Sequence, residues 1–212
     1  MTFEDARVLD IAETLACTDL GHPVRVAVDG ITASGKSTVA AAITRALGRL
    51  DRQSIHLTMD GFHHPRAHRH RQGRMSAEGY YWDAYDFDSL ISRVLVPLGP
   101  GGSGSYCEGV IDLQSDRRLD TEPRHAPKNA VLVVDGTFLQ RPPLDAHWDT
   151  TVFVDTDFDT ARERGTQRDS KLLGGRERAT EAFHLRYHAA SRIYVDTVNP
   201  KALATFVIDN NR

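Results

Sequence analysis

Eight residues near the start of the chain have the types and the spacing needed to hold a polyphosphate. The segment Gly30-Ile31-Thr32-Ala33-Ser34-Gly35-Lys36-Ser37 fits G-x-x-x-x-G-K-[ST]; it follows a short apolar run and opens an Ala-rich one. Its glycines let backbone N–H groups face phosphate oxygens, and the helix start adds its positive dipole end. Lys36 can reach the β- and γ-phosphates, and Ser37 can ligate Mg²⁺. We expect this loop to bind nucleotide through Gly30, Thr32, Ala33, Ser34, Gly35, Lys36, Ser37 and Thr38, the alternative being a Gly-rich turn with an exposed lysine.

Two aspartates follow apolar runs and could complete the chemistry. Asp60 comes after the run 54–59, and Asp135 comes after the run 130–134. In an open parallel sheet both would lie at the carboxyl edge, where ligands bind. Asp60 could accept the proton of an acceptor hydroxyl or bind metal through water, and Asp135 could join Ser37 at Mg²⁺. Either aspartate could instead cap a turn and do nothing more.

Basic residues recur on a predicted helix, 157–168, and continue beyond Gly174-Gly175. A hinged lid over 161–178 would use Arg164 and Arg168 to stabilise the charge that develops during phosphoryl transfer. The alternative is a charged helix face in solvent. The lid interpretation makes the expected catalytic set Lys36, Asp60, Arg164 and Arg168.

Short apolar segments alternating with helical patterns are expected to position these residues. Strands are expected at 24–28, 54–59, 130–134, 151–154 and 205–208, and helices at 3–20, 37–50, 86–96, 157–168 and 176–195. This alternation predicts an α/β fold with three layers, a parallel five-stranded sheet and helices on both faces. With the phosphate loop it predicts a P-loop NTPase fold plus a lid. We expect one domain over 1–212, with acceptor-side excursions at 61–85 and 97–129.

Composition narrows the class of protein. The 26 Lys and Arg against 29 Asp and Glu give a net charge of −3, which argues against a nucleic-acid or polybasic membrane binder. No apolar run approaches the ~20 residues that span a bilayer. The two cysteines fit a reducing cytosol. The expectation is a cytoplasmic protein with a small-molecule substrate, no nucleic-acid or membrane partner, and possible homo-oligomers.

Two classes of P-loop protein, metabolite kinases and regulatory ATPases, fit these features, whereas switch GTPases do not. A switch GTPase would need Asn-Lys-x-Asp and Asp-x-x-Gly, and neither occurs in the chain. A small P-loop domain with a long polar excursion after its second strand is typical of a metabolite kinase, which transfers the γ-phosphoryl group of ATP to a hydroxyl. The alternative is a regulatory nucleotide-binding ATPase that signals to a protein partner.

Several segments resemble the uridine kinase/phosphoribulokinase family of P-loop kinases, over most of the chain. Met59-Asp60-Gly61-Phe62-His63 is similar to the family's Asp-x-Phe-Tyr segment, and Val134-Asp135-Gly136 to its apolar-Glu-Gly segment. The first segment is also similar to bacterial pantothenate kinases. The resemblance implies Mg²⁺-dependent use of ATP, with Asp60 as base and a C-terminal turn, 204–210, near adenine. The resemblance also aligns residues 79–86 with the family's acceptor-binding segment. Of the family's Tyr-Asp-plus-His loop, this sequence retains at most Tyr106.

The acceptor side is where the sequence is least decisive. Residues 60–74 hold four histidines and four arginines, with Asp60 as the only acidic residue. This segment could recognise a carboxylate or phosphate on the acceptor, or it could be a solvated basic loop. The aromatic residues of 80–85 could stack a base or sugar, or pack on the core. The expected substrate contacts are His63, Arg66, Tyr81, Trp82, Asp83 and Tyr106.

Overall fold

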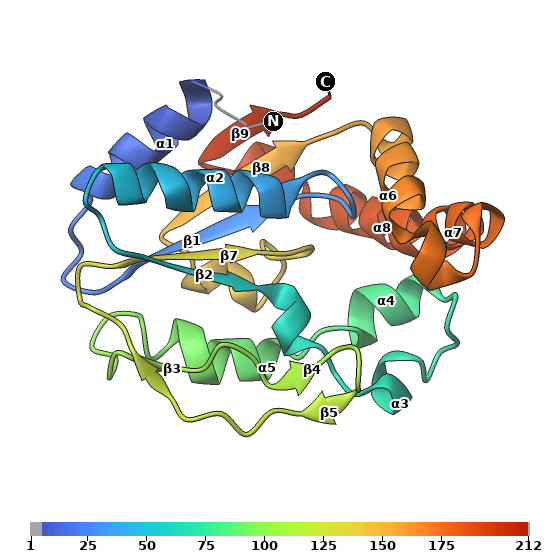
Figure 1. Ribbon diagram of the computed structural model, residues 1–212, viewed down its shortest axis with the longest axis horizontal. Helices are drawn as coiled ribbons and strands as arrows, with labels where there is room; N and C mark the ends of the chain where they lie inside the picture. Colours follow the sequence, from blue (N-terminus) through green and yellow to red (C-terminus); the bar gives the residue numbers. More distant parts are fainter. Residues whose placement is uncertain (1–5, 212) are drawn as a thin grey trace.

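Five parallel strands form the centre of the computed structural model, which describes residues 6–211 (Figure 1). Their spatial order is β2-β7-β1-β8-β9, which confirms the predicted sheet. The inner strands β1 and β7 are Val-rich and buried along their whole length, as strands covered on both faces must be. The strands are β1 (Val24–Asp29), β2 (Ser54–Thr58), β7 (Val131–Asp135), β8 (Thr150–Asp155) and β9 (Phe206–Asp209).

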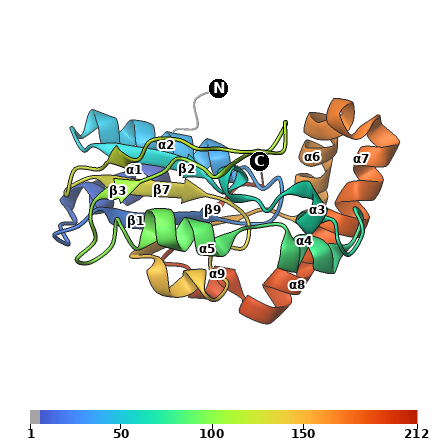
Figure 2. The ribbon, with the colours of Figure 1, turned by 90° about the horizontal axis from the view of Figure 1, so that it is seen from below.

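Helices cover both faces of this sheet (Figure 2). On one face, α1 (Ala6–Cys17) and α2 (Lys36–Arg49) pack their apolar sides on the strands. The first residues of the helix expected at 3–20 lie outside the described part. The second core, on the other face, is built from α4 (Ala77–Asp83), α5 (Phe87–Leu90), the π-helical turn η2 (Ile91–Leu95) and α8 (His188–Val198).

The two acceptor-side excursions contain short elements that periodicity did not reveal. Beyond β2 the chain forms the 3-10 helix η1 (Met59–Phe62), α3 (Arg66–Arg69) and α4. Segment 97–129 holds two antiparallel pairs of short strands. These pairs are β3 (Ser105–Tyr106) with β6 (Arg124–His125), and β4 (Ile111–Asp112) with β5 (Arg117–Arg118). Elsewhere in the chain, η3 (Leu144–His147) and α9 (Pro200–Leu203) are short helical connections.

The helices α6 (Phe158–Leu173) and α7 (Arg176–Ala182) form a hairpin at the end of the molecule where α2 begins (Figure 1). The helix expected at 157–168 continues to Leu173 and ends where Gly174 adopts a left-handed φ of 83°. The helix expected at 176–195 contains a π-helical turn, η4 (Phe183–Tyr187), between α7 and α8. Among the described residues, no helix combines the length and the apolar character needed to cross a bilayer.

A close contact fixes the position of α6 against η4. A Cβ atom at Gly165 would overlap the fully buried ring of Phe183. We therefore predict that Gly165→Ala lowers the free energy of unfolding by about 1–3 kcal/mol, the usual cost of overpacking. Urea denaturation followed by circular dichroism measures this change.

Gly48→Ala is the matched control for that substitution. Gly48 also lies in a helix, and a Cβ atom there meets no other atom within 4 Å. Its replacement should therefore stabilise the protein by up to ~1 kcal/mol through helix propensity. Equal stability of the two variants would contradict the proposed contact.

Candidate active site

The phosphate loop joins the end of β1 to the start of α2 in a strained path. Ala33 and Gly35 adopt left-handed φ angles of 67° and 92°. A side chain at Gly30 would lie 2.6 Å from Ser34 Oγ and 2.7 Å from the Val154 carbonyl oxygen, so only glycine fits. These conformations allow the loop to curl around a ligand placed over the start of α2, where the helix dipole favours an anion.

A buried carboxyl group, Asp29, holds the first residue of this loop. Its Oδ1 accepts a hydrogen bond from the Gly30 backbone N–H at 2.8 Å. Its Oδ2 accepts from Gln140 Nε2 at 3.1 Å and from the Tyr194 hydroxyl. Burial raises the pKa of Asp29, although these donors and the nearby Lys36 oppose the shift. The network ties the loop to α8, which carries Tyr194.

The middle of the loop is held from two further directions. The His188 ring nitrogen Nε2 lies 3.2 Å from the Thr32 carbonyl oxygen. Burial lowers the pKa of His188 to about 4, so the ring is neutral at pH 7 and can donate Nε2–H to that carbonyl. On the other side, Asn210 Nδ2 donates to the Ser34 carbonyl oxygen at 2.8 Å, and Arg164 donates to the Asn210 carbonyl at 2.8 Å. The C-terminal turn therefore packs directly on the phosphate loop.

Lys36 occupies a buried position at the centre of the loop. Its Nζ donates to the Ile31 carbonyl oxygen at 2.7 Å, and the residue is 8% exposed. Burial lowers the pKa of Lys36 to about 8, against the opposing effect of Asp29 and Asp135. A bound polyphosphate would add negative charge beside the ammonium group and raise this pKa again.

Ser37 and Asp135 are brought together by the pairing of the inner strands. Asp135 is the last residue of β7, in register with Val28 of β1 and with Thr58 of β2. Ser37 Oγ donates to Asp135 Oδ2 at 2.6 Å, and His56 Nε2 lies 2.8 Å from Oδ1. A hydroxyl and a carboxylate at the carboxyl edge of the sheet form an oxygen donor set of the kind that Mg²⁺ binds beside a phosphate.

Asp60 lies in η1, two residues after the end of β2. Its carboxylate faces His63, whose Nε2 is 3.6 Å from Asp60 Oδ1, while His63 Nδ1 is 2.9 Å from the Ala84 carbonyl oxygen. The hydrogen-bonding and charge of His63 lower the pKa of Asp60, and Lys36 and Arg168 add to this shift. The carboxylate is therefore ionised at neutral pH and can accept a hydrogen bond from a hydroxyl.

One cleft of about 800 Å³ joins the phosphate loop to Asp60 and to the α6–α7 hairpin. Arg168 lines it from α6, and its guanidinium pairs with Asp169 at 2.8 Å. The structure brings together in this cleft nine of the residues expected at the site, namely Thr32, Ala33, Lys36, Ser37, Asp60, His63, Arg66, Asp135 and Arg168. Gly30, Ser34 and Gly35 belong to the loop and Thr38 to the first turn of α2, and none of the four lines the cleft.

Five other expected residues lie outside the cleft. Arg164 bonds the C-terminal turn, as described above. Tyr81 is 4% exposed in the second core, and the neighbouring Trp82 is 58% exposed with the Arg141 guanidinium over its ring. Asp83 pairs with Arg71 and accepts from Gln72. Tyr106 lines a separate groove with His125 and Pro127.

The cleft also contains residues that were not among the expected substrate contacts, although Tyr80 belongs to the aromatic cluster 80–85 noted in the sequence. Tyr80, Tyr187 and Arg186 line it from α4 and η4, and Arg74 and His70 line it from the segment around α3. Arg74 and His70 belong to the basic segment noted in the sequence. No sequence signal points to Arg186, because the π-helical turn that places it interrupts the regular helical period.

The buried ammonium of Lys36 predicts a proton linkage. A triphosphate should bind the protonated lysine, so its affinity should fall about tenfold as the pH rises from ~7 to ~9, through the pKa of about 8. Binding near pH 8.5 should also take up a proton, which calorimetry in buffers of different ionisation enthalpy measures. Lys36→Arg keeps its charge over this range and should show neither effect. A wild-type affinity that stays flat to pH 9 would refute the linkage.

Comparison with known proteins identifies the same family that the sequence motifs resemble. The profile of the phosphoribulokinase/uridine kinase family matches residues 26–210. Uridine-cytidine kinase B of Dictyostelium discoideum is 29% identical over 170 residues, which are 78% of this chain and 65% of that protein. The chain thus spans about two thirds of that relative's length.

Two further relatives cover nearly the whole fold. Uridine kinase of Chloroflexus aurantiacus is 29% identical over 180 residues, which are 84% of this chain and 82% of that protein. The solved structure of a possible uridine kinase from Bacillus stearothermophilus superposes with a TM-score of 0.73 at 20% identity, covering 96% of this chain and 97% of that one. The structural match, at 20% identity, shows a shared fold. The family profile matches most of the chain, and the chain therefore belongs to the phosphoribulokinase/uridine kinase family.

Proposed function

We propose that this protein transfers the γ-phosphoryl group of ATP, bound with Mg²⁺, to a hydroxyl group of a small metabolite. The observation that carries the proposal is that the phosphate loop and Asp60 share one cleft. Lys36 and Asp60 are close enough for each to shift the pKa of the other. A transferring phosphoryl group and an acceptor hydroxyl could therefore meet between them.

The residues present fit both ATP and Mg²⁺. The left-handed loop, the buried Lys36 and the start of α2 suit the β- and γ-phosphates, and Ser37 with Asp135 suits the metal. When bound, the metal would neutralise charge on the phosphates. Arg168, at the edge of the lid, would stabilise charge on the transferring group.

Asp60 is assigned to the acceptor hydroxyl. Its lowered pKa makes it a weak base before transfer begins. Its first task is therefore to orient the hydroxyl through a hydrogen bond, and it takes the proton as the new P–O bond forms. This order suits a loose transition state, in which the nucleophile is deprotonated late.

The acceptor class includes nucleosides, sugars and pantothenate-type alcohols. The relatives named uridine kinases make uridine one compound to test. A regulatory ATPase is less well supported, because the cleft extends well beyond the phosphate loop to η1, α3 and η4. A thermal-shift panel with a non-hydrolysable ATP analogue separates the two: a kinase gains extra stabilisation from one acceptor, whereas a switch responds to nucleotide alone.

Asp60→Asn tests the assignment directly. The substitution keeps the shape of the side chain and removes its charge, so turnover should fall by roughly 10²–10⁴, the usual contribution of a positioned base. Nucleotide affinity should stay at the wild-type value. A coupled assay of ADP release in the presence of acceptor measures the first quantity, and calorimetry measures the second.

Asp145→Asn is the control for this variant. Asp145 is also the second residue of a four-residue 3-10 helix, η3, and it is exposed outside the cleft. Wild-type turnover is expected. If Asp60→Asn instead weakens nucleotide binding and leaves turnover intact, Asp60 belongs to the metal site and not to the acceptor.

A further inference from the structure

One wall of the cleft carries a buried arginine for which the described part of the chain supplies no counter-ion. Arg186 is 8% exposed, and its Nη1 donates to the Arg74 carbonyl oxygen at 2.8 Å. Its Nε has no hydrogen-bond partner, and within residues 6–211 no carboxylate forms an ion pair with it. A buried guanidinium without a counter-ion is costly, and a bound anion would offset that cost.

Aromatic rings hold this guanidinium in place. Arg186 Cζ lies 5.1 Å from the centre of the Tyr80 ring and 5.3 Å from that of Tyr187. The Tyr80 hydroxyl lies 2.9 Å from the hydroxyl of Tyr85, whose ring contacts His63 at 4.3 Å between centroids. Through Tyr80 and Tyr85 the guanidinium is connected to His63, the partner of Asp60. The π-helical turn η4, a feature common at functional sites, places Arg186 there.

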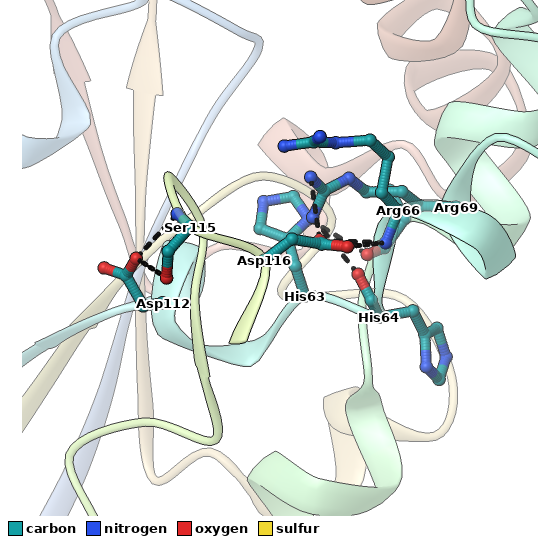
Figure 3. Close-up of polar contacts among 8 residues, drawn as sticks. His63, His64, Arg66, Arg69, Asp112, Ser115 and Asp116 are labelled. Atoms are coloured by element: carbon teal, nitrogen blue, oxygen red, sulfur yellow. Dashed lines mark hydrogen bonds and ion pairs between the residues drawn. The ribbon is translucent and has the colours of Figure 1, made fainter. Parts of the chain in front are cut away.

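Two exposed arginines extend the same wall. Arg66 and Arg74 line the cleft, and neither side chain forms an ion pair with any described residue. Asp116 accepts from the Arg66 backbone N–H at 2.9 and 3.0 Å and pairs with Arg69 Nη2 at 3.3 Å (Figure 3). This aspartate therefore fixes the start of α3 and neutralises Arg69, but it leaves the Arg66 guanidinium available.

The electrostatic balance of the cleft is positive. Its lining holds six lysine and arginine side chains and three aspartates, Asp60, Asp135 and Asp169. Asp60 faces His63, Asp135 faces Ser37 and His56, and Asp169 pairs with Arg168. Burial lowers the pKa of His70, and four arginines lower it further, namely Arg186, Arg69, Arg74 and Arg66. These four charges thus act together at one end of the cleft.

We propose that Arg186, Arg74 and Arg66 form a subsite for an anionic group, a carboxylate or a phosphate, on the acceptor. This proposal rests on the proposed function and adds to it the chemical class of the substrate. The acceptor would place its hydroxyl at Asp60 and its anion at Arg186, which a planar guanidinium can bind with two hydrogen bonds. Arg71 is not part of the subsite, because it pairs with Asp83 outside the cleft.

Matched acceptors test the class of substrate. Phosphorylation should be assayed with D-glycerate against glycerol, and with ribose 5-phosphate against ribose, so that the two arms separate a carboxylate from a phosphate. A higher kcat/KM for one anionic member supports the subsite. If only neutral acceptors are phosphorylated, the protein is a kinase and the anion subsite is wrong.

Substitutions locate the effect on the cleft wall. Arg74→Gln and Arg66→Gln change exposed side chains, and the Arg74 carbonyl that Arg186 bonds remains in place. Each should raise the KM of the anionic acceptor about ten- to a hundredfold and leave the KM of ATP unchanged. Arg117→Gln, in the exposed strand β5, is the control and should change neither. A rise in the KM of ATP instead would assign these arginines to the nucleotide.

A binding experiment decides the case in which no acceptor of the panel is phosphorylated. With the phosphate loop saturated by Mg²⁺ and a non-hydrolysable ATP analogue, inorganic phosphate and acetate are titrated while Tm is recorded. One of these ions should stabilise the wild type and Arg117→Gln more than Arg74→Gln and Arg186→Gln. Identical shifts in all four proteins would overturn the subsite, and Arg74→Gln keeps the test valid if Arg186→Gln does not fold.

Discussion

The buried ammonium of Lys36 is the constraint on which the arrangement of the site depends. Desolvation acts against its charge, and Asp29, Asp135 and Asp60 each act in favour of it. Two of these carboxyl groups end the neighbouring strands β1 and β7, and the third follows β2. The sheet order β2-β7-β1 therefore places all three around one lysine. A triphosphate entering the loop meets a charge that the protein has only partly neutralised.

Charges on the acceptor side of the cleft are balanced differently from those around the phosphate loop. Around the phosphate loop carboxylates balance the charge of Lys36, whereas beyond Asp60 most of the charged side chains that line the cleft are arginines. Asp116 and Asp83 neutralise Arg69 and Arg71, the two arginines of 63–74 that are tied into the local structure. Arg66 and Arg74 are left without ion pairs to described residues. This selective pairing is the basis on which we propose that the segment binds an anion.

The sequence predicted the sheet and the phosphate loop because both are local in origin. Short Val-rich runs such as 131–134 are typical of buried parallel strands, and the glycine spacing of the loop follows from backbone sterics. The direction of side chains outside the sheet depends instead on how distant parts of the chain pack together. Tyr81 and Asp83 belong to the same short helix as Tyr80, but only Tyr80 reaches the cleft. The alignment of Tyr106 with an acceptor loop did not anticipate that β3 pairs with β6 away from the site.

The two halves of the site are joined by one continuous stretch of helix. From α8, His188 and Tyr194 hold the phosphate loop, and from η4, Arg186 and Tyr187 line the acceptor side. The π-helical turn between α7 and α8 shifts the helical phase, so that Arg186 and Tyr187 line the cleft whereas His188 and Tyr194 are buried outside its lining. Because α7 leads directly into η4, the α6–α7 hairpin is continuous in the chain with Arg186, whose Nη1 donates to the Arg74 carbonyl oxygen.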